Sequence, residues 1–154
     1  MNMIQKIMNI LMNPNAELIN IISIPCTLIE VIIHVNISLV LLNKFTCRKN
    51  KYLCILFIYV LIIINRLIII APFNVILNVL IFIFMYLIFF KVQLVEACIA
   101  VSVPFLLTAL FEMISSQIYT LIFNRPYAEF ASYPLYAIIF LLIVYTCMFI
   151  ILQL

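Results

Sequence analysis

The sequence has no glycine and no aspartate, one histidine, and few charged residues. Without glycine there can be no glycine-rich phosphate-binding loop and no GxxxG helix crossing, so helix contacts must use Ala, Ser, Thr or larger side chains. Only 8% of the residues are charged and 69% are hydrophobic, against about a quarter and about half in an average soluble domain. A water-soluble fold cannot bury that much apolar surface. The composition therefore predicts an integral membrane protein.

The apolar runs predict helices rather than a membrane barrel. They are continuous and far longer than the roughly 10-residue alternating segments of a transmembrane strand. In lipid a helix satisfies its backbone hydrogen bonds within one segment, so the high Ile and Val content does not argue against it. About 20 apolar residues cross a hydrocarbon core of about 30 Å, so the chain has room for roughly five or six spans. The predicted fold is an all-α, polytopic transmembrane helical bundle.

The chain divides into a short N-terminal segment and one membrane domain. In residues 1–17 apolar side chains recur at helical spacing, which predicts a short interfacial helix that is too short to span. Residues 18–154 form the transmembrane domain. Its five predicted spans are residues 18–42, 52–70, 73–90, 94–123 and 134–154. Pro72 marks a corner between the second and third spans, and the fourth span is long enough to tilt or to kink at Pro104.

Basic residues predict the orientation in the cell membrane. The only concentrated charge is a basic loop after the first span, made up of Lys44, Arg48, Lys49 and Lys51. Lys91, after the third span, falls on the same side if all five segments cross. Because Lys and Arg favour the cytoplasmic side, the N-terminus is predicted outside and the C-terminus inside. If Asn65 and Arg66 prevent the second segment from spanning, every later segment inverts.

One polar stripe follows the first span. Its members step by three or four positions and therefore share a helix face: Ser23, Thr27, Glu30, His34 and Ser38. An ionised side chain near the bilayer centre costs about 2.5 to 3.5 kcal/mol on insertion scales. We therefore expect Glu30 to face other helices, to be paired or to be protonated.

A second stripe on the fourth span allows two interpretations. It consists of Thr108, Glu112, Ser115 or Ser116, and Tyr119. In the functional interpretation, Glu30, His34, Arg66 and Glu112 are candidates for a polar cavity that senses or carries a ligand. In the packing interpretation, Arg66 pairs with Glu112 or Glu30, and His34 bonds Glu30 on its own helix. Glu112 is the preferred partner of Arg66, since both lie in the outer half of neighbouring spans, and packing is the preferred role of His34.

The residue types predict no catalytic, metal or cofactor site, and so no enzyme. Glu30 and His34 supply only two metal ligands, and Cys26 lies about 12 Å along the helix axis from His34, too far for a Cys-His pair. The five cysteines form no C-x-x-C pair and are expected to behave as small buried hydrophobes. The basic loop is interpreted as a contact with anionic headgroups, not with nucleic acid.

With these features placed, the chain resembles the membrane sensor half of accessory-gene-regulator-type peptide-sensing histidine kinases of low-GC Gram-positive bacteria. The resemblance covers about residues 18–154. It rests on Leu28-Ile29-Glu30, the basic loop, the Ile/Leu-rich hairpin over residues 52–90, and Glu112. It implies a homodimer that binds a secreted peptide on its outer face and signals to a cytoplasmic kinase. The sequence ends at Leu154 without a kinase part, so we expect either a sensor module of a longer protein or a free-standing membrane protein.

The leading hypothesis is a membrane signal-sensing module that relays to a cytoplasmic kinase or response partner. Its ligand surface would be formed by two outer loops, residues 71–74 and 124–133. One alternative is a small transporter component in which Glu30 and Glu112 line a site near the midplane of the bilayer. Another is a non-catalytic membrane assembly protein.

Overall fold

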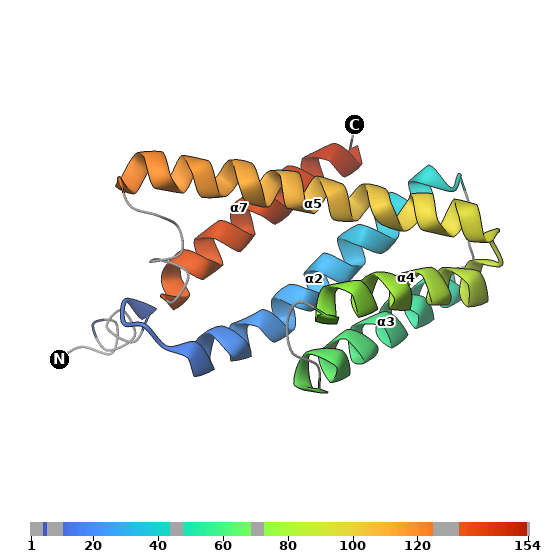
Figure 1. Ribbon diagram of the computed structural model, residues 1–154, viewed down its shortest axis with the longest axis horizontal. Coiled ribbons are helices and arrows are strands. Elements are labelled where there is room, and N and C mark those ends of the chain that lie inside the picture. The colour runs from blue at the N-terminus through green and yellow to red at the C-terminus, as the bar shows by residue number, and fades with distance from the viewer. Residues whose placement is uncertain (1–4, 6–10, 44–47, 69–72, 125–132, 154) are drawn as a thin grey trace. The chain divides into compact units, whose positions relative to one another are not determined.

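The computed structural model describes residues 5, 11–43, 48–68, 73–124 and 133–153. Over this part the chain forms five helices and no strand (Figure 1). The helices are α2 (Ala16–Leu41), α3 (Arg48–Ile68), α4 (Phe73–Phe90), α5 (Leu94–Phe123) and α7 (Pro134–Gln153). The predicted all-α fold is confirmed, and each helix begins and ends within a few residues of a predicted span. The interfacial helix predicted within residues 1–17 falls largely outside the described residues.

Four of these helices, α2 to α5, are long and apolar enough to cross a membrane. The chain is therefore a multi-pass integral membrane protein. The apolar stretch of α7, Pro134–Ile150, is shorter, and its crossing of the membrane stays a prediction. Both α2 and α5 contain an internal proline, Pro25 and Pro104, and each helix continues past it.

Local side-chain chemistry fixes where the helices begin. Asn15 Oδ1 accepts a hydrogen bond from the Leu18 backbone N–H at 3.0 Å, which caps the first turn of α2. At the start of α5 the carboxylate of Glu96 accepts from the Gln93 backbone N–H at 3.2 Å, half of a capping box. Pro134 occupies the first position of α7, where a missing N–H has no cost.

Three helices end on a residue in the left-handed conformation. These residues are Asn43, Lys91 and Asn124, with φ of 48°, 49° and 51°. Glycine usually fills this position, and in a chain without glycine asparagine is the next best choice because it tolerates the left-handed region. Lys91 has no such tolerance, and its conformation is disfavoured by about 1 to 2 kcal/mol.

The chain forms two compact units. Unit 1 contains residues 1–26 and 108–154, and unit 2 contains residues 27–107. The boundary falls inside α2 and inside α5, shortly after the internal proline of each helix. Both helices therefore contribute one part to each unit.

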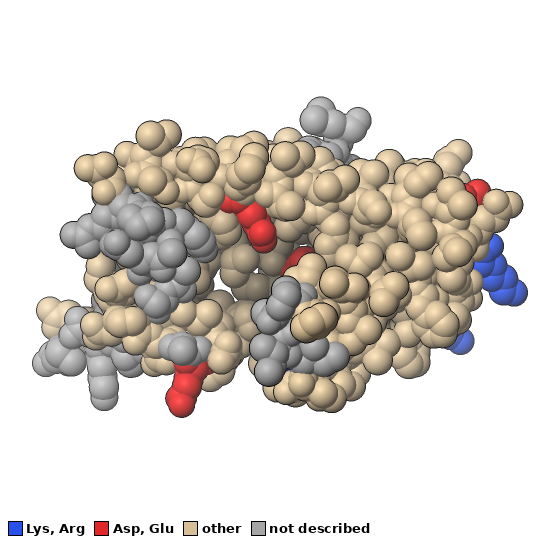
Figure 2. Space-filling model, in the orientation of Figure 1, with Lys and Arg blue, Asp and Glu red and all other residues tan. Residues whose placement is uncertain are grey.

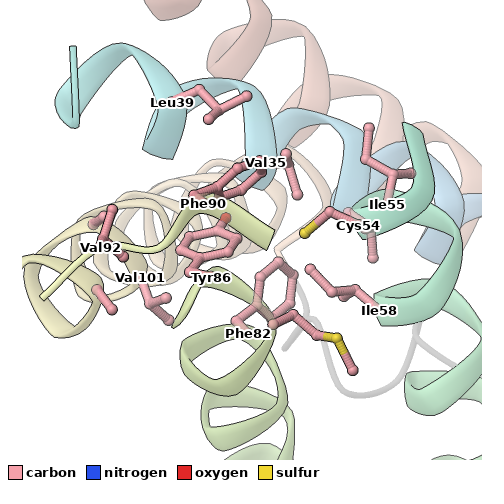
Figure 3. Close-up of a cluster of buried hydrophobic side chains, with 14 of the residues drawn as sticks. Val35, Leu39, Cys54, Ile55, Ile58, Phe82, Tyr86, Phe90, Val92 and Val101 are labelled. Carbon is pink, nitrogen blue, oxygen red and sulfur yellow. The ribbon is translucent and has the colours of Figure 1, made fainter. Parts of the chain in front are cut away.

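Unit 2 packs α3 and α4 side by side as a hairpin, together with the adjoining parts of α2 and α5. Figure 3 shows its buried core, which draws side chains from every one of these helices. The members labelled there are Val35, Leu39, Cys54, Ile55, Ile58, Phe82, Tyr86, Phe90, Val92 and Val101. Ala97 and Ala100 of α5 are buried as well, which allows a close helix approach without glycine. The expectation that Ala and larger side chains would replace glycine at helix contacts is confirmed.

Unit 1 has a smaller aromatic core. Tyr119, Phe140 and Val144 are buried in it, and the Tyr119 ring lies 6.1 Å from Phe140, centroid to centroid. Thr108 also joins α5 to α7, since its hydroxyl donates to the Met148 sulfur at 3.1 Å. Thr108 and Tyr119, two members of the predicted α5 stripe, are thus packed against α7.

Outside the cores the helices expose large apolar side chains, as lipid-facing surfaces do. Several hydroxyl residues on these surfaces bond within their own helices. Ser102, Thr120 and Thr146 each donate to the backbone carbonyl four residues earlier, at 2.7 to 2.9 Å. Such bonds leave no unsatisfied hydroxyl towards lipid.

Candidate functional site

Arg66 joins α3 to α2 inside unit 2. It lies in the last turn of α3, and its Nη1 donates a hydrogen bond to Thr27 Oγ1 at 2.6 Å. Its Nη2 lies 3.8 Å from Glu30 Oε2, the distance of an ion pair without a direct hydrogen bond. Thr27 is buried, whereas the side chains of Arg66 and Glu30 are 35% and 27% exposed. The guanidinium is thus held by α2 and still reachable from outside the unit.

This pairing corrects one expectation from the sequence. Glu112 was the preferred partner of Arg66, on the ground that both lie in the outer half of their spans. The structure gives the ion pair to Glu30, the second acid considered, because the adjoining part of α2 packs with α3 in unit 2. Glu112 belongs to unit 1.

An amide cluster next to Arg66 escaped the sequence analysis. Asn65 Nδ2 donates to Asn78 Oδ1 at 2.7 Å and to the Asn74 carbonyl at 3.0 Å. Asn78 Nδ2 in turn donates to Asn74 Oδ1 at 3.0 Å. Asn74 and Asn78 lie one turn apart on α4, and this i, i+4 spacing opposite an Asn on α3 was the available signal. The three amides join the end of α3 to the beginning of α4.

One atom of the amide cluster has no partner. Asn65 is 4% exposed, and its Oδ1 is buried and accepts no hydrogen bond from any described residue. A buried acceptor left in this way costs about 1 to 3 kcal/mol. The amide cluster is therefore well connected through its donors and poorly satisfied at one acceptor.

Together these residues form what we call the polar cluster, contributed by three helices of unit 2. Its members are Thr27, Glu30, Asn65, Arg66, Asn74 and Asn78. Arg66 offers five N–H donors in a planar fork that suits carboxylates, and the contacts to α2 leave several of them available. The cluster can therefore bind an acceptor group, such as a carboxylate or a peptide carbonyl.

Two further members of the α2 stripe face the interior of unit 2, as expected for polar residues of a membrane helix, whereas Ser23 belongs to unit 1 and donates to the Asn20 carbonyl of its own helix at 2.7 Å. His34 is 1% exposed, and its ring lies 4.7 Å from Phe105 and 5.6 Å from Phe82, centroid to centroid. Ser38 is fully buried and donates to the Ala100 carbonyl of α5 at 2.7 Å. His34 therefore packs among aromatic rings, and its expected bond to Glu30 stays a prediction.

Glu112 belongs to unit 1, where it lines an open cavity. The cavity has a volume of about 570 Å³ and is lined by Ile19, Ala109, Glu112, Met113, Ser116, Ala137, Phe140 and Leu141. Ser116 donates to the backbone carbonyl of Met113 at 2.8 Å. Glu112 is exposed, and it makes no ion pair or hydrogen bond with the described residues. The four candidate residues thus separate into Glu30, His34 and Arg66 in unit 2 and Glu112 in unit 1.

The basic residues gather at the other end of unit 2 from the polar cluster. Lys49 and Lys51 lie in the first turn of α3, and Lys91 directly follows α4 (Figures 1 and 2). Lys44 lies outside the described residues, and Arg48 is described only through its backbone at the start of α3. The described lysines thus lie at one end of the α3–α4 hairpin, which agrees with their predicted place on one side of the membrane.

Comparison of the chain with protein-family models, with curated proteins and with solved structures gave no match. The function is therefore inferred from the residues of the chain and from their geometry.

Proposed function

We propose that this membrane protein is a signal-sensing module that binds an extracellular peptide or small ligand at the polar cluster. The proposal places the end of α3 and the beginning of α4 outside, and the lysine-bearing end of the hairpin in the cytoplasm. Binding would be relayed there to a kinase or another response partner. The proposal includes a homodimer and no enzymatic activity.

A line of polar contacts, continued through the backbone of α3 from Asn65 to Arg66, supports this proposal. It begins at Asn74, next to the proposed outer connection, and passes to Asn65 on α3. The adjacent Arg66 continues it to Thr27 and Glu30 on α2. Elsewhere unit 2 is held mainly by apolar side chains. A ligand that contacts the beginning of α4 can therefore influence α2 through directional bonds.

The free donors of Arg66 suggest the chemical class of the ligand. A guanidinium that is about one-third exposed can bind the terminal carboxylate or the backbone carbonyls of a peptide. A ligand carboxylate would compete with Glu30 for the positive charge of this group, even where it uses other N–H donors. Peptide binding would thus weaken the α2–α3 contact.

The unsatisfied Asn65 oxygen suggests that the polar cluster can adopt two conformations. Because the present arrangement leaves a buried acceptor without a donor among the described residues, an arrangement that supplies one can lie close in energy. A ligand shifts such an equilibrium only by its differential affinity for the two states. A ligand N–H or a rearranged amide that reaches Asn65 Oδ1 would provide this difference.

The test uses the strain that encodes the chain and its own secreted products. The low-molecular-mass fraction of spent medium is added to washed cells, with and without protease treatment, and transcripts are compared. We expect a protease-sensitive response that is lost on deletion of the gene and strongly reduced by Arg66→Gln and Asn78→Ala. Both variants break the polar cluster while leaving the apolar core unchanged.

The matched control is Asn36→Ala on α2. Within the described part of the chain Asn36 donates only to the Ile32 carbonyl of its own helix, at 2.7 Å, so its loss should leave the response intact. Membrane levels of every variant are compared by immunoblot. A response that is unchanged in Arg66→Gln at equal protein levels would contradict the proposal, as would a response that persists after deletion.

A further inference from the structure

We infer that the cavity around Glu112 in unit 1 is a binding site for a lipophilic cation, a small molecule with one positive charge on an apolar body. The site is distinct from the polar cluster, since all residues that line it belong to unit 1. The inference therefore stands independently of the proposed sensing function.

Glu112 lies near the middle of its helix and therefore deep in the membrane. α5 contains 30 residues, and Glu112 lies within four positions of its midpoint, or about 5 Å along the axis. The polar headgroups of a bilayer begin about 15 Å from its centre. A carboxylate at this depth is far from bulk water and from lipid headgroup amines, and its ionised form is favoured by a partner that can itself enter the hydrocarbon.

The described residues of the protein supply no positively charged partner for Glu112. Glu112 is exposed in the cavity, and the described ion pair of the protein joins two other residues, Arg66 and Glu30. Ser116, the other polar side chain of the cavity wall, donates its hydroxyl to a backbone carbonyl. A positive charge brought by a ligand would fill this role.

The walls of the cavity determine what carries that charge. Apart from Glu112 and Ser116 the lining is apolar, and Phe140 and Met113 offer an aromatic ring and a polarisable thioether. Aromatic faces attract cations, and their affinity rises when the cation is desolvated. A volume of about 570 Å³ lies within the range of about 300 to 1,000 Å³ that is typical of small-molecule sites. The cavity therefore suits an apolar, aromatic cation better than a hydrated inorganic one.

The experiment measures equilibrium binding of radiolabelled tetraphenylphosphonium to the purified full chain in lipid nanodiscs. We expect saturable binding that Glu112→Gln weakens at least about tenfold, equivalent to about 1.4 kcal/mol. Glu112→Asp keeps the charge and should retain most of the affinity. Neutral triphenylphosphine oxide has a similar apolar body and should not compete.

Two further variants separate the site from general effects on folding. Glu96→Gln removes a carboxylate from the first turn of the same helix, outside the cavity, and should bind as the wild type does. Ala137→Phe fills the cavity from α7 while Glu112 stays, and should also weaken binding. All variants are first shown to be monodisperse by size-exclusion chromatography. Equal affinity of the wild type and Glu112→Gln would overturn the inference, as would equal competition by the neutral compound. If Glu112→Gln does not fold, full affinity in Ala137→Phe would overturn it.

Discussion

Arg66 and Thr27 are 39 positions apart in the sequence, yet the guanidinium of one donates a 2.6 Å hydrogen bond to the hydroxyl of the other. The bond crosses from the last turn of α3 to a buried position on α2. In a bilayer an interhelical hydrogen bond contributes about 0.6 to 2 kcal/mol, which is large relative to one apolar contact. This contact and the nearby ion pair therefore fix how the two helices meet.

Replacing Thr27 by valine should destabilise the protein by about 0.6 to 2 kcal/mol, because valine keeps the shape and removes the acceptor of Arg66. The measurement is the midpoint temperature of aggregation, from heated detergent extracts analysed by size-exclusion chromatography. The matched control is Thr146→Val, since Thr146 donates only to the Leu142 carbonyl of its own helix. An equal fall in both variants would show that the interhelical bond contributes nothing of its own.

Exchanging the charges of Glu30 and Arg66 should restore what each single reversal loses. Glu30→Arg places two cations together, and Arg66→Glu places two anions together, so each should lower the yield of folded protein. The double variant again has opposite charges on facing positions. Its comparison pair is Arg66→Glu with Glu96→Arg, in which the second change lies in the first turn of α5. No recovery in the first pair, or equal recovery in both, would contradict the ion pair.

Glu30 also distinguishes sensing from transport. A carrier that cycles protons or cations through Glu30 should stop working in Glu30→Gln, because glutamine has no titratable charge. A sensor in which Arg66 is held mainly by its hydrogen bond to Thr27 should tolerate glutamine, which keeps a polar group near the guanidinium, and fail with leucine, which removes it. We expect the second result in the transcript response to the peptide fraction. Equal loss with both variants, together with uptake of that fraction by liposomes containing the chain, would support transport instead.

Reporter fusions test the orientation. Fusions after Lys51 and after Leu154 should both report the cytoplasm, and one at Ala128 should report the exterior, since the basic residues favour the cytoplasmic side. The fusion at Ala128 is the informative one. A cytoplasmic signal there would mean that α3, with Asn65 and Arg66 near its end, does not cross the membrane.

Much of the fold followed from the sequence because its causes are local. The length of an apolar run sets the length of a membrane helix, and α4 and α5 begin and end at the predicted residues. Thr27, His34 and Ser38 of the α2 stripe face the interior for the same kind of reason, since polar groups are costly in lipid. Spacing along one helix was enough to identify that face.

The partners of these residues were decided only by tertiary structure. Without glycine motifs, the fit of large side chains decides which helices meet, and no local pattern records it. The similar predicted depth of Arg66 and Glu112 in the membrane therefore did not identify the partner of Arg66. Arg66 pairs with Glu30 because this part of α2 and α3 belong to one unit. The i, i+4 spacing of Asn74 and Asn78 placed them on one helix face, but only the packing of α3 against α4 decided that Asn65 meets them. The sequence determined which residues lipid could not tolerate, and the packing of the helices determined what each of them meets instead.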